Sequence, residues 1–203
     1  MWKDCGVNNQ ETYRPRANLI FAGFGAVLSG LFTWSSFYQS SSTTELTSVL
    51  VALFVLICIY IFLIRPKITF SDEGVVITNP LEEITVGWAD VIQLDTRWAL
   101  SIETKEFTVS SWAATASGRH KGQSIHHTEI KGLDIQLGES IRKSDSPHSD
   151  SGAAAYRARV RLKRFQDSGS YQSLPTARVR HLKPLIFAIA TLITAIAVNT
   201  FSH

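Results

Sequence analysis

The sequence predicts a membrane protein of the α+β class, with three transmembrane helices and a cytoplasmic antiparallel β-domain. Three uncharged apolar blocks of bilayer length predict the helices, and a period-two alternation that begins just after the second block predicts the sheet. The chain has 203 residues, of which 45% are hydrophobic and 18% are charged. These proportions fit one small domain plus membrane segments better than a single globule.

The apolar blocks cover residues 18–38, 46–64 and 184–201. None contains Asp, Glu, Lys, Arg or His, and each is close to the roughly 20 residues that a helix needs to cross a bilayer. Buried helices of a soluble domain are the alternative, but uncharged runs of this length are rare there. The first block lacks an Ala-x-Ala cleavage pattern and is followed at once by the second, so we read it as a retained span and not as a signal peptide.

Basic residues predict the orientation of the spans because Lys and Arg resist translocation. They precede the first and third blocks and follow the second, whereas the connector at 39–45 has none; the residues concerned are Lys3, Arg14, Arg16, Arg65, Lys67, Arg178, Arg180 and Lys183. This pattern places the N-terminus and the β-domain in the cytoplasm and the C-terminus outside. The predicted segments are a cytoplasmic tail (1–17), a transmembrane hairpin (18–64), a β-domain (65–138), a linker with a basic helical segment (139–183) and a third transmembrane helix (184–203).

The first span carries a strip of small residues. Ala22, Ala26 and Gly30 repeat every four residues, which lets another helix approach closely. The second span of the same hairpin is the expected partner, and a helix of a different protein is the alternative.

Six short runs after the second span predict β-strands, because apolar residues alternate with polar or small ones. Tight turns are predicted at Asp72–Gly74 and at Asn79–Pro80, since Pro is excluded from a central ladder. Strands this short and this close together imply an antiparallel meander that curls to bury one face. The runs are 68–70, 75–77, 84–88, 91–96, 99–104 and 106–111, and residues 133–137 allow a seventh.

Residues 139–152 are rich in Ser and charge and predict a linker. The following stretch, 153–165 (AAAYRARVRLKRF), has an alanine-rich start and a possible N-cap in Ser149 or Ser151, which favours a helix. Its strict alternation of apolar and basic residues also fits a strand. We favour the helix.

Several turns and motifs follow the membrane hairpin in a particular order: Arg65-Pro66 at the membrane exit, Asp72-Glu73-Gly74, Asn79-Pro80, and Trp88-Ala89-Asp90-Val91. In this order and spacing they resemble the opening of a bacterial pleckstrin-homology (PH) domain, of the family associated with actinobacterial low-molecular-weight protein antigen 6. The resemblance covers about residues 18–115. It implies a bacterial plasma membrane location and a PH-like curved sheet closed by a C-terminal helix, which 153–165 would supply.

Two residues of the last motif have expected structural roles. Trp88 alternates in phase with Ile84 and Val86, which predicts core packing in preference to ligand stacking. Asp90 is expected to accept backbone hydrogen bonds where one strand ends and the next begins.

PH domains that bind phosphoinositides use Lys and Arg in the loop between the first two strands, but this loop carries Asp72 and Glu73. Because acidic side chains repel phosphate, the resemblance implies the fold without the usual ligand.

Catalytic and metal-binding patterns are not found in the sequence. His120, His126, His127 and His148 lack accompanying Cys and the spacing of well-defined zinc sites. No nucleophile elbow and no Gly-rich phosphate loop occurs either. We therefore expect no enzyme, no metal and no cofactor, and no nucleic-acid partner because the basic run lacks interleaved aromatic residues.

The strongest electrostatic feature is the basic run Arg157, Arg159, Arg161, Lys163 and Arg164. It either contacts anionic lipid or simply marks the cytoplasmic side.

The sequence thus predicts a non-enzymatic, membrane-anchored PH-like interaction module. We expect it to be an accessory or scaffold subunit of a larger inner-membrane complex, such as a respiratory or cell-envelope assembly, with membrane lipids and other integral membrane proteins as partners. The alternative is a peripheral module that senses anionic lipid through segment 157–164.

Overall fold

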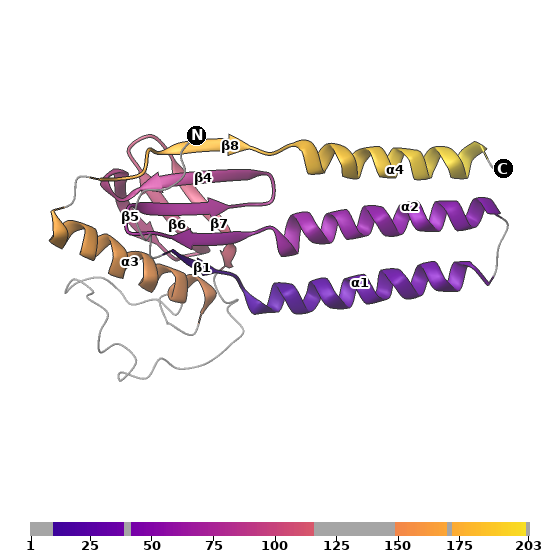
Figure 1. Cartoon of the computed structure of the whole chain (residues 1–203), viewed down its shortest axis with the longest axis horizontal. Coiled ribbons are helices and arrows are strands. Elements are labelled where there is room, and N and C mark those ends of the chain that lie inside the picture. Colours follow the sequence, from indigo (N-terminus) through magenta and orange to yellow (C-terminus); the bar gives the residue numbers. More distant parts are fainter. Residues whose placement is uncertain (1–9, 39–41, 116–148, 170–171, 202–203) are drawn as a thin grey trace. The chain divides into compact units, whose positions relative to one another are not determined.

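The computed structural model describes residues 10–38, 42–115, 149–169 and 172–201 (Figure 1). The chain divides into two compact units. The first contains the β-sheets and the helix that packs on them, and the second contains three long apolar helices.

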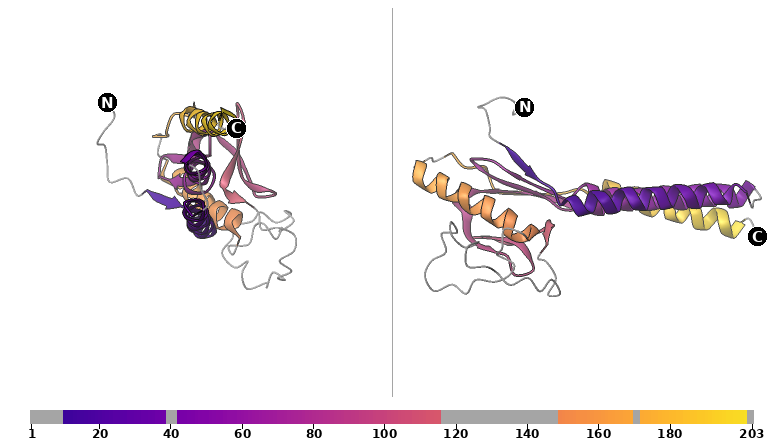
Figure 2. Two further views of the ribbon diagram at one scale, coloured as in Figure 1. Left: turned by 90° about the vertical axis from the view of Figure 1, so that its right-hand side faces the viewer. Right: turned by 90° about the horizontal axis from the view of Figure 1, so that it is seen from below.

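The second unit is a row of three helices that are long and apolar enough to cross a membrane, as expected. They are α1 (Arg16–Ser36), α2 (Ser42–Ile59), which continues into a π-helical turn (Tyr60–Ile64), and α4 (Lys183–Phe201). Helix α2 contacts both α1 and α4 and lies between them, as the side view and the end-on view agree (Figures 1 and 2).

Helix α1 meets α2 along a narrower strip than the sequence predicts. Ala22 and Ser29 are buried, and the Ser29 hydroxyl donates a 3.5 Å hydrogen bond to the Ala52 carbonyl of α2. A methyl group on Gly25 would come within 2.8 Å of the end of the Ile59 side chain, so the two helices lie close together there. Gly30, by contrast, is exposed, and a methyl group on it would meet no atom within 4 Å. Of the predicted strip, Ala22 is buried, Ala26 is half-buried and Gly30 lies outside the α1–α2 contact, so a helix of a different protein stays the alternative partner for Gly30.

The first unit contains two antiparallel sheets and not the single predicted meander. In spatial order, the five-stranded sheet consists of β1 (Glu11–Tyr13), β2 (Lys67–Phe70), β3 (Gly74–Thr78), β4 (Glu82–Gly87) and β8 (Ala177–Arg180). The three-stranded sheet consists of β5 (Val91–Asp95), β6 (Ala99–Thr104) and β7 (Thr108–Thr115). A short 3-10 turn at Trp88–Asp90 separates β4 from β5 and carries the chain from one sheet to the other.

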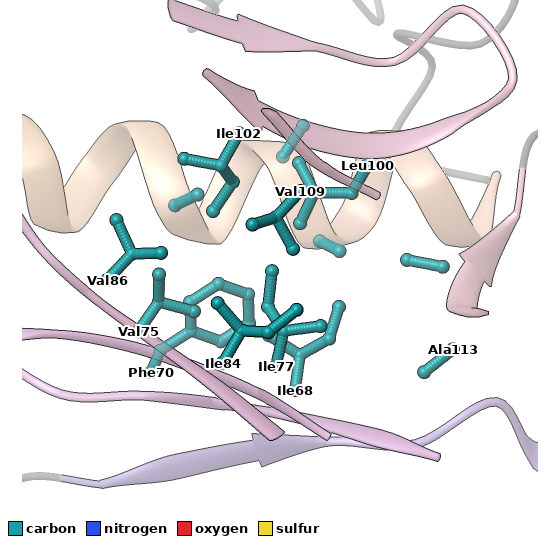
Figure 3. Packing of buried hydrophobic residues seen from close by; sticks show 14 of the residues in the cluster. Ile68, Phe70, Val75, Ile77, Ile84, Val86, Leu100, Ile102, Val109 and Ala113 are labelled. Carbon is teal, nitrogen blue, oxygen red and sulfur yellow. The ribbon is translucent and has the colours of Figure 1, made fainter. Parts of the chain in front are cut away.

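The predicted inward-facing residues form the core of this unit (Figure 3). Alternate residues of β2, β3 and β4 are almost fully buried and face residues from β6, β7 and helix α3 (Asp150–Ser168). The main members are Ile68, Phe70, Val75, Ile77, Ile84, Val86, Leu100, Ile102 and Val109. Period two along each strand thus places one apolar face of each sheet against this shared core.

Helix α3 confirms the helical interpretation of 153–165. The Ser149 side chain accepts a 2.9 Å hydrogen bond from the Gly152 amide, and Gly169 ends the helix in a left-handed conformation with φ 58°. The buried residues Ala154, Ala155 and Ala158 follow the helical period and pack against the core. Their small size lets the helix backbone lie close to the sheets.

Several boundaries differ from the prediction. Trp88 is buried but lies in the 3-10 turn and not in β4, and β7 continues to Thr115 although the alternation weakens after Trp112. Strands β1 and β8 were not predicted. The expected strand at 133–137 and the four histidines considered as metal ligands lie outside the described residues.

Candidate functional site

Two arginines of α3 bind the N-terminal strand and the β2–β3 turn, and we call this group the arginine cluster. Arg161 is only 6% exposed, and its guanidinium lies 2.7 Å from an Asp72 carboxylate oxygen and 3.8 Å from a Glu11 carboxylate oxygen. Arg157 lies 2.6 Å from the other Glu11 oxygen. The spacing of four residues places both guanidinium groups on one face of the helix.

Tyr13 completes the arginine cluster on the β1 side. Its hydroxyl donates a short hydrogen bond to Asp150, and the Arg157 guanidinium lies 5.1 Å from the centre of its ring, within the range of a cation–π contact. Burial and the hydrogen bond to Asp150 raise the pKa of the Tyr13 hydroxyl well above its usual value, so it stays protonated as a donor. Glu11 and Tyr13 point to the same face of β1 because they are two residues apart.

The arginine cluster contains two of the five residues predicted to contact anionic lipid. Arg157 and Arg161 are held by carboxylates within the domain, and Arg159 and Lys163 also take part in interactions. Arg164 is exposed. Two of the five residues, Arg157 and Arg161, therefore hold α3 to β1 and to the β2–β3 turn, which weakens the case for these two as lipid contacts.

A second group of interactions holds residues 172–176, the strap, across the end of the five-stranded sheet. The Leu174 amide donates a 3.0 Å hydrogen bond to the Glu73 carbonyl, and the Ser173 hydroxyl accepts one of 3.2 Å from the Ala89 amide. Gly74 and Gly87 lie beneath the strap, where a methyl group on Gly87 would overlap Leu174 and Ser173. The absence of a side chain at Gly87 is what admits the strap.

The Asp90 carboxylate binds the strap in a way that corrects its expected role. It accepts a short hydrogen bond from the Thr176 hydroxyl, whereas backbone donors were predicted. The same hydroxyl accepts a 3.4 Å hydrogen bond from the Gly87 amide. Thr176 thereby links Asp90 to the end of β4.

The remaining motif residues also bind distant parts of the chain. The Asn79 side chain donates to the Ser110 carbonyl at 3.0 Å and accepts from the Trp112 amide at 2.8 Å, so it satisfies two backbone groups of β7. The Trp88 indole donates a 3.0 Å hydrogen bond to the Ser71 carbonyl. Within the second unit, the Pro80 carbonyl accepts a 2.7 Å hydrogen bond from the Arg65 guanidinium.

No protein-family model matches the sequence, and no curated protein and no solved structure resembles it at a significant level.

The described polar clusters hold parts of this chain to one another. Among the residues with described positions, no three His, Cys, Asp or Glu side chains gather as a metal site would require. The carboxylates of Glu11, Asp72, Asp90 and Asp150 are engaged by arginine, threonine or tyrosine side chains. Together these contacts hold β1, α3 and the strap, which are far apart in the sequence, to the five-stranded sheet.

Sequence reasoning identified the fold motif residues but missed their partners. Asp72, Gly74, Asn79, Trp88 and Asp90 were expected to form turns and core, and each also binds or adjoins another segment. The pattern Glu11-Thr12-Tyr13 was a usable signal, since it alternates an acid with an aromatic residue just before the first span. The strap carried no signal, because its hydrogen bonds use backbone groups and small hydroxyls.

Proposed function

We propose that this protein is a non-enzymatic, membrane-anchored PH-like interaction module that serves as an accessory or scaffold subunit of a larger inner-membrane complex. The bacterial plasma membrane location and the cytoplasmic side of the domain belong to this proposal. The single observation that carries it is the outer face of α1. On that face Gly23 and Gly30 are exposed, and a methyl group on either would meet no atom within 4 Å.

Gly23 and Gly30 are suited to contact with a helix of another protein. A spacing of seven residues places them only about 20° apart around a helix of 3.6 residues per turn. Gly25 and Ser29, which face α2, lie well away from this direction. Small residues let two helix backbones approach closely, and close approach drives association in lipid, where the hydrophobic effect between helices is absent.

The β-domain offers a second surface of the kind that proteins use for binding. Trp98, in the connection between β5 and β6, is 73% exposed, and Ile92 on β5 is 59% exposed. Exposed tryptophan is enriched among the residues that dominate binding energy at protein interfaces. These positions support a protein partner in preference to a small ligand.

The deciding experiment is purification of the full chain in mild detergent, with mass spectrometry of the proteins that accompany it. We expect a stoichiometric integral membrane partner with the wild type and its loss in the double variant Gly23→Leu, Gly30→Leu. The open space around both glycines means that the leucines leave the α1–α2 interface intact. Ala190→Leu is the matched control, since it adds the same bulk to an exposed position of α4.

Two outcomes would contradict the proposal. One is recovery of the wild type alone and monodisperse. The other is a partner retained equally by the double variant and by Ala190→Leu.

A further inference from the structure

Strand β1 pairs with one edge of β2 and contacts Arg157 and Arg161 of α3. We call this edge and the two arginines the β1 seat. We propose that the β1 seat also accepts β1 from a second copy of this chain, so that two copies exchange their N-terminal strands in the membrane. This inference goes beyond the proposed function, which concerns a different protein as partner.

Strand β1 is held by specific interactions but buries little. It pairs with β2 over three residues, with Glu11 opposite Phe70, Thr12 opposite Thr69 and Tyr13 opposite Ile68. The Glu11 and Thr12 side chains are exposed, and Tyr13 is half-buried. Most of what holds β1 is therefore ion pairs and hydrogen bonds near the surface, which are modest in net free energy. None of the fully buried core residues belongs to β1, and Tyr13 is its one residue that packs against the core.

An empty β1 seat would be unfavourable. The backbone of β2 would become an unpaired sheet edge beside the buried residues Ile68 and Phe70. Arg157 would lose both its carboxylate partner and its aromatic partner, and Arg161 would keep only Asp72. The seat therefore selects a replacement strand that has an acidic residue two positions before an aromatic one.

The β1 strand of a second copy meets these requirements because its sequence is identical. Its β1 carries the same Glu11 and Tyr13, and only Arg14 and Pro15 separate that strand from the helix α1 of that copy. Chains confined to one bilayer present this strand at the same depth, which raises its effective concentration at the seat of a neighbour. Exchange of an identical element costs little, because each ion pair and hydrogen bond that β1 makes within its own chain is remade with the neighbouring chain.

Cysteine pairs test the exchange directly in the full chain. Thr12 and Thr69 are directly opposite each other, and their hydroxyl oxygens are 3.5 Å apart. In a background without the native thiols, Cys5→Ser and Cys58→Ala, one tagged chain carries Thr12→Cys and a differently tagged chain carries Thr69→Cys. After co-expression and oxidation in membranes, we expect a covalent dimer that contains both tags. Glu11→Ala in the first chain should reduce its yield.

Matched controls keep the test decisive. Thr85 lies in the same row of the sheet two strands further on, because Thr69 is opposite Val76 and Val76 is opposite Thr85. Thr12→Cys paired with Thr85→Cys in separate chains should give no dimer. A single chain with both Thr12→Cys and Thr69→Cys should form an internal disulfide, which verifies the geometry. The proposal is overturned if the mixed Thr12/Thr69 pair gives no more dimer than the Thr85 control, or if the single chain fails to form the internal bond.

Discussion

Replacement of Arg161 by Ala tests whether the arginine cluster holds β1 and the β2–β3 turn to α3. The variant removes a guanidinium that is 6% exposed and leaves two carboxylates, Asp72 and Glu11, without it. Arg157→Ala is the comparison within the same cluster, because Arg157 is 36% exposed and binds Glu11 alone among the carboxylates of the cluster.

The expected loss follows from the exposure of the partners. Removal of one partner from a fully buried ion pair costs about 3–5 kcal/mol, because the other charge stays buried. Here the Asp72 and Glu11 side chains are 57% and 46% exposed, so water solvates them once Arg161 is gone. The cost then approaches that of one charged hydrogen bond, about 2 kcal/mol, or roughly a 30-fold change in the opening equilibrium. Arg157→Ala should cost about 1 kcal/mol or less.

Hydrogen exchange of the full chain in detergent micelles measures this change. We expect the amides of β2, β3 and α3 to lose roughly 30-fold protection in Arg161→Ala, whereas those of α1 and α2 serve as an internal reference. Asp72→Ala made in both backgrounds completes a double-mutant cycle, and its effect should shrink when Arg161 is absent. Unchanged protection, or strictly additive effects of the two substitutions, would refute the reasoning.

Three further variants test other parts of the domain. Gly87→Ala should displace the strap and destabilise the domain by about 2 kcal/mol or more, seen as reduced protection at residues 172–176, because its methyl group has no space. Phenolate absorbance should show that the pKa of Tyr13 is raised above its usual value, because the hydroxyl is buried and donates a hydrogen bond to Asp150. The contribution of Tyr13 to stability is therefore complete below about pH 10 and is lost as the pH rises further, and Tyr13→Phe should remove this dependence. Trp98→Ala should change stability by less than about 0.5 kcal/mol, because the side chain is 73% exposed, yet reduce recovery of the partner in the purification assay.

Periodicity was enough to predict the core and most strands. The alternation from Ile68 to Val86 placed the right side chains inside, and the uncharged blocks predicted three helices of membrane-spanning length. Both signals are local, because a strand or a helix repeats its burial every two or 3.6 residues. Residues 153–165 fit both a strand, by their strict alternation, and a helix. They form a helix, which the N-cap Ser149 and the alanines that pack closely on the sheets favour.

The missed features all depend on interactions between distant residues. Strands β1 and β8 are exposed along most of their length, so neither presents the buried apolar face that predicted β2 and β3. Gly30 was assigned to the α1–α2 interface from spacing alone, which cannot tell which of two small-residue faces a neighbour uses. The pairing of Arg161 with Asp72 spans 89 positions, and a charge run gives no indication of such a partner.

The strap also orders the steps by which the chain is made. Its residues reach Glu73 across 100 positions, and β8, which follows the strap directly, closes the edge of β4. A nascent chain that has synthesised β4 must therefore wait, with that edge open and with Gly74 and Gly87 uncovered, until about residue 180 has left the ribosome. Strand β8, the last strand of the sheet, ends at Arg180, and α4 begins at Lys183. The sheet is therefore complete in sequence only a few residues before the third apolar helix begins. Completion of the five-stranded sheet thereby coincides with the start of α4 synthesis.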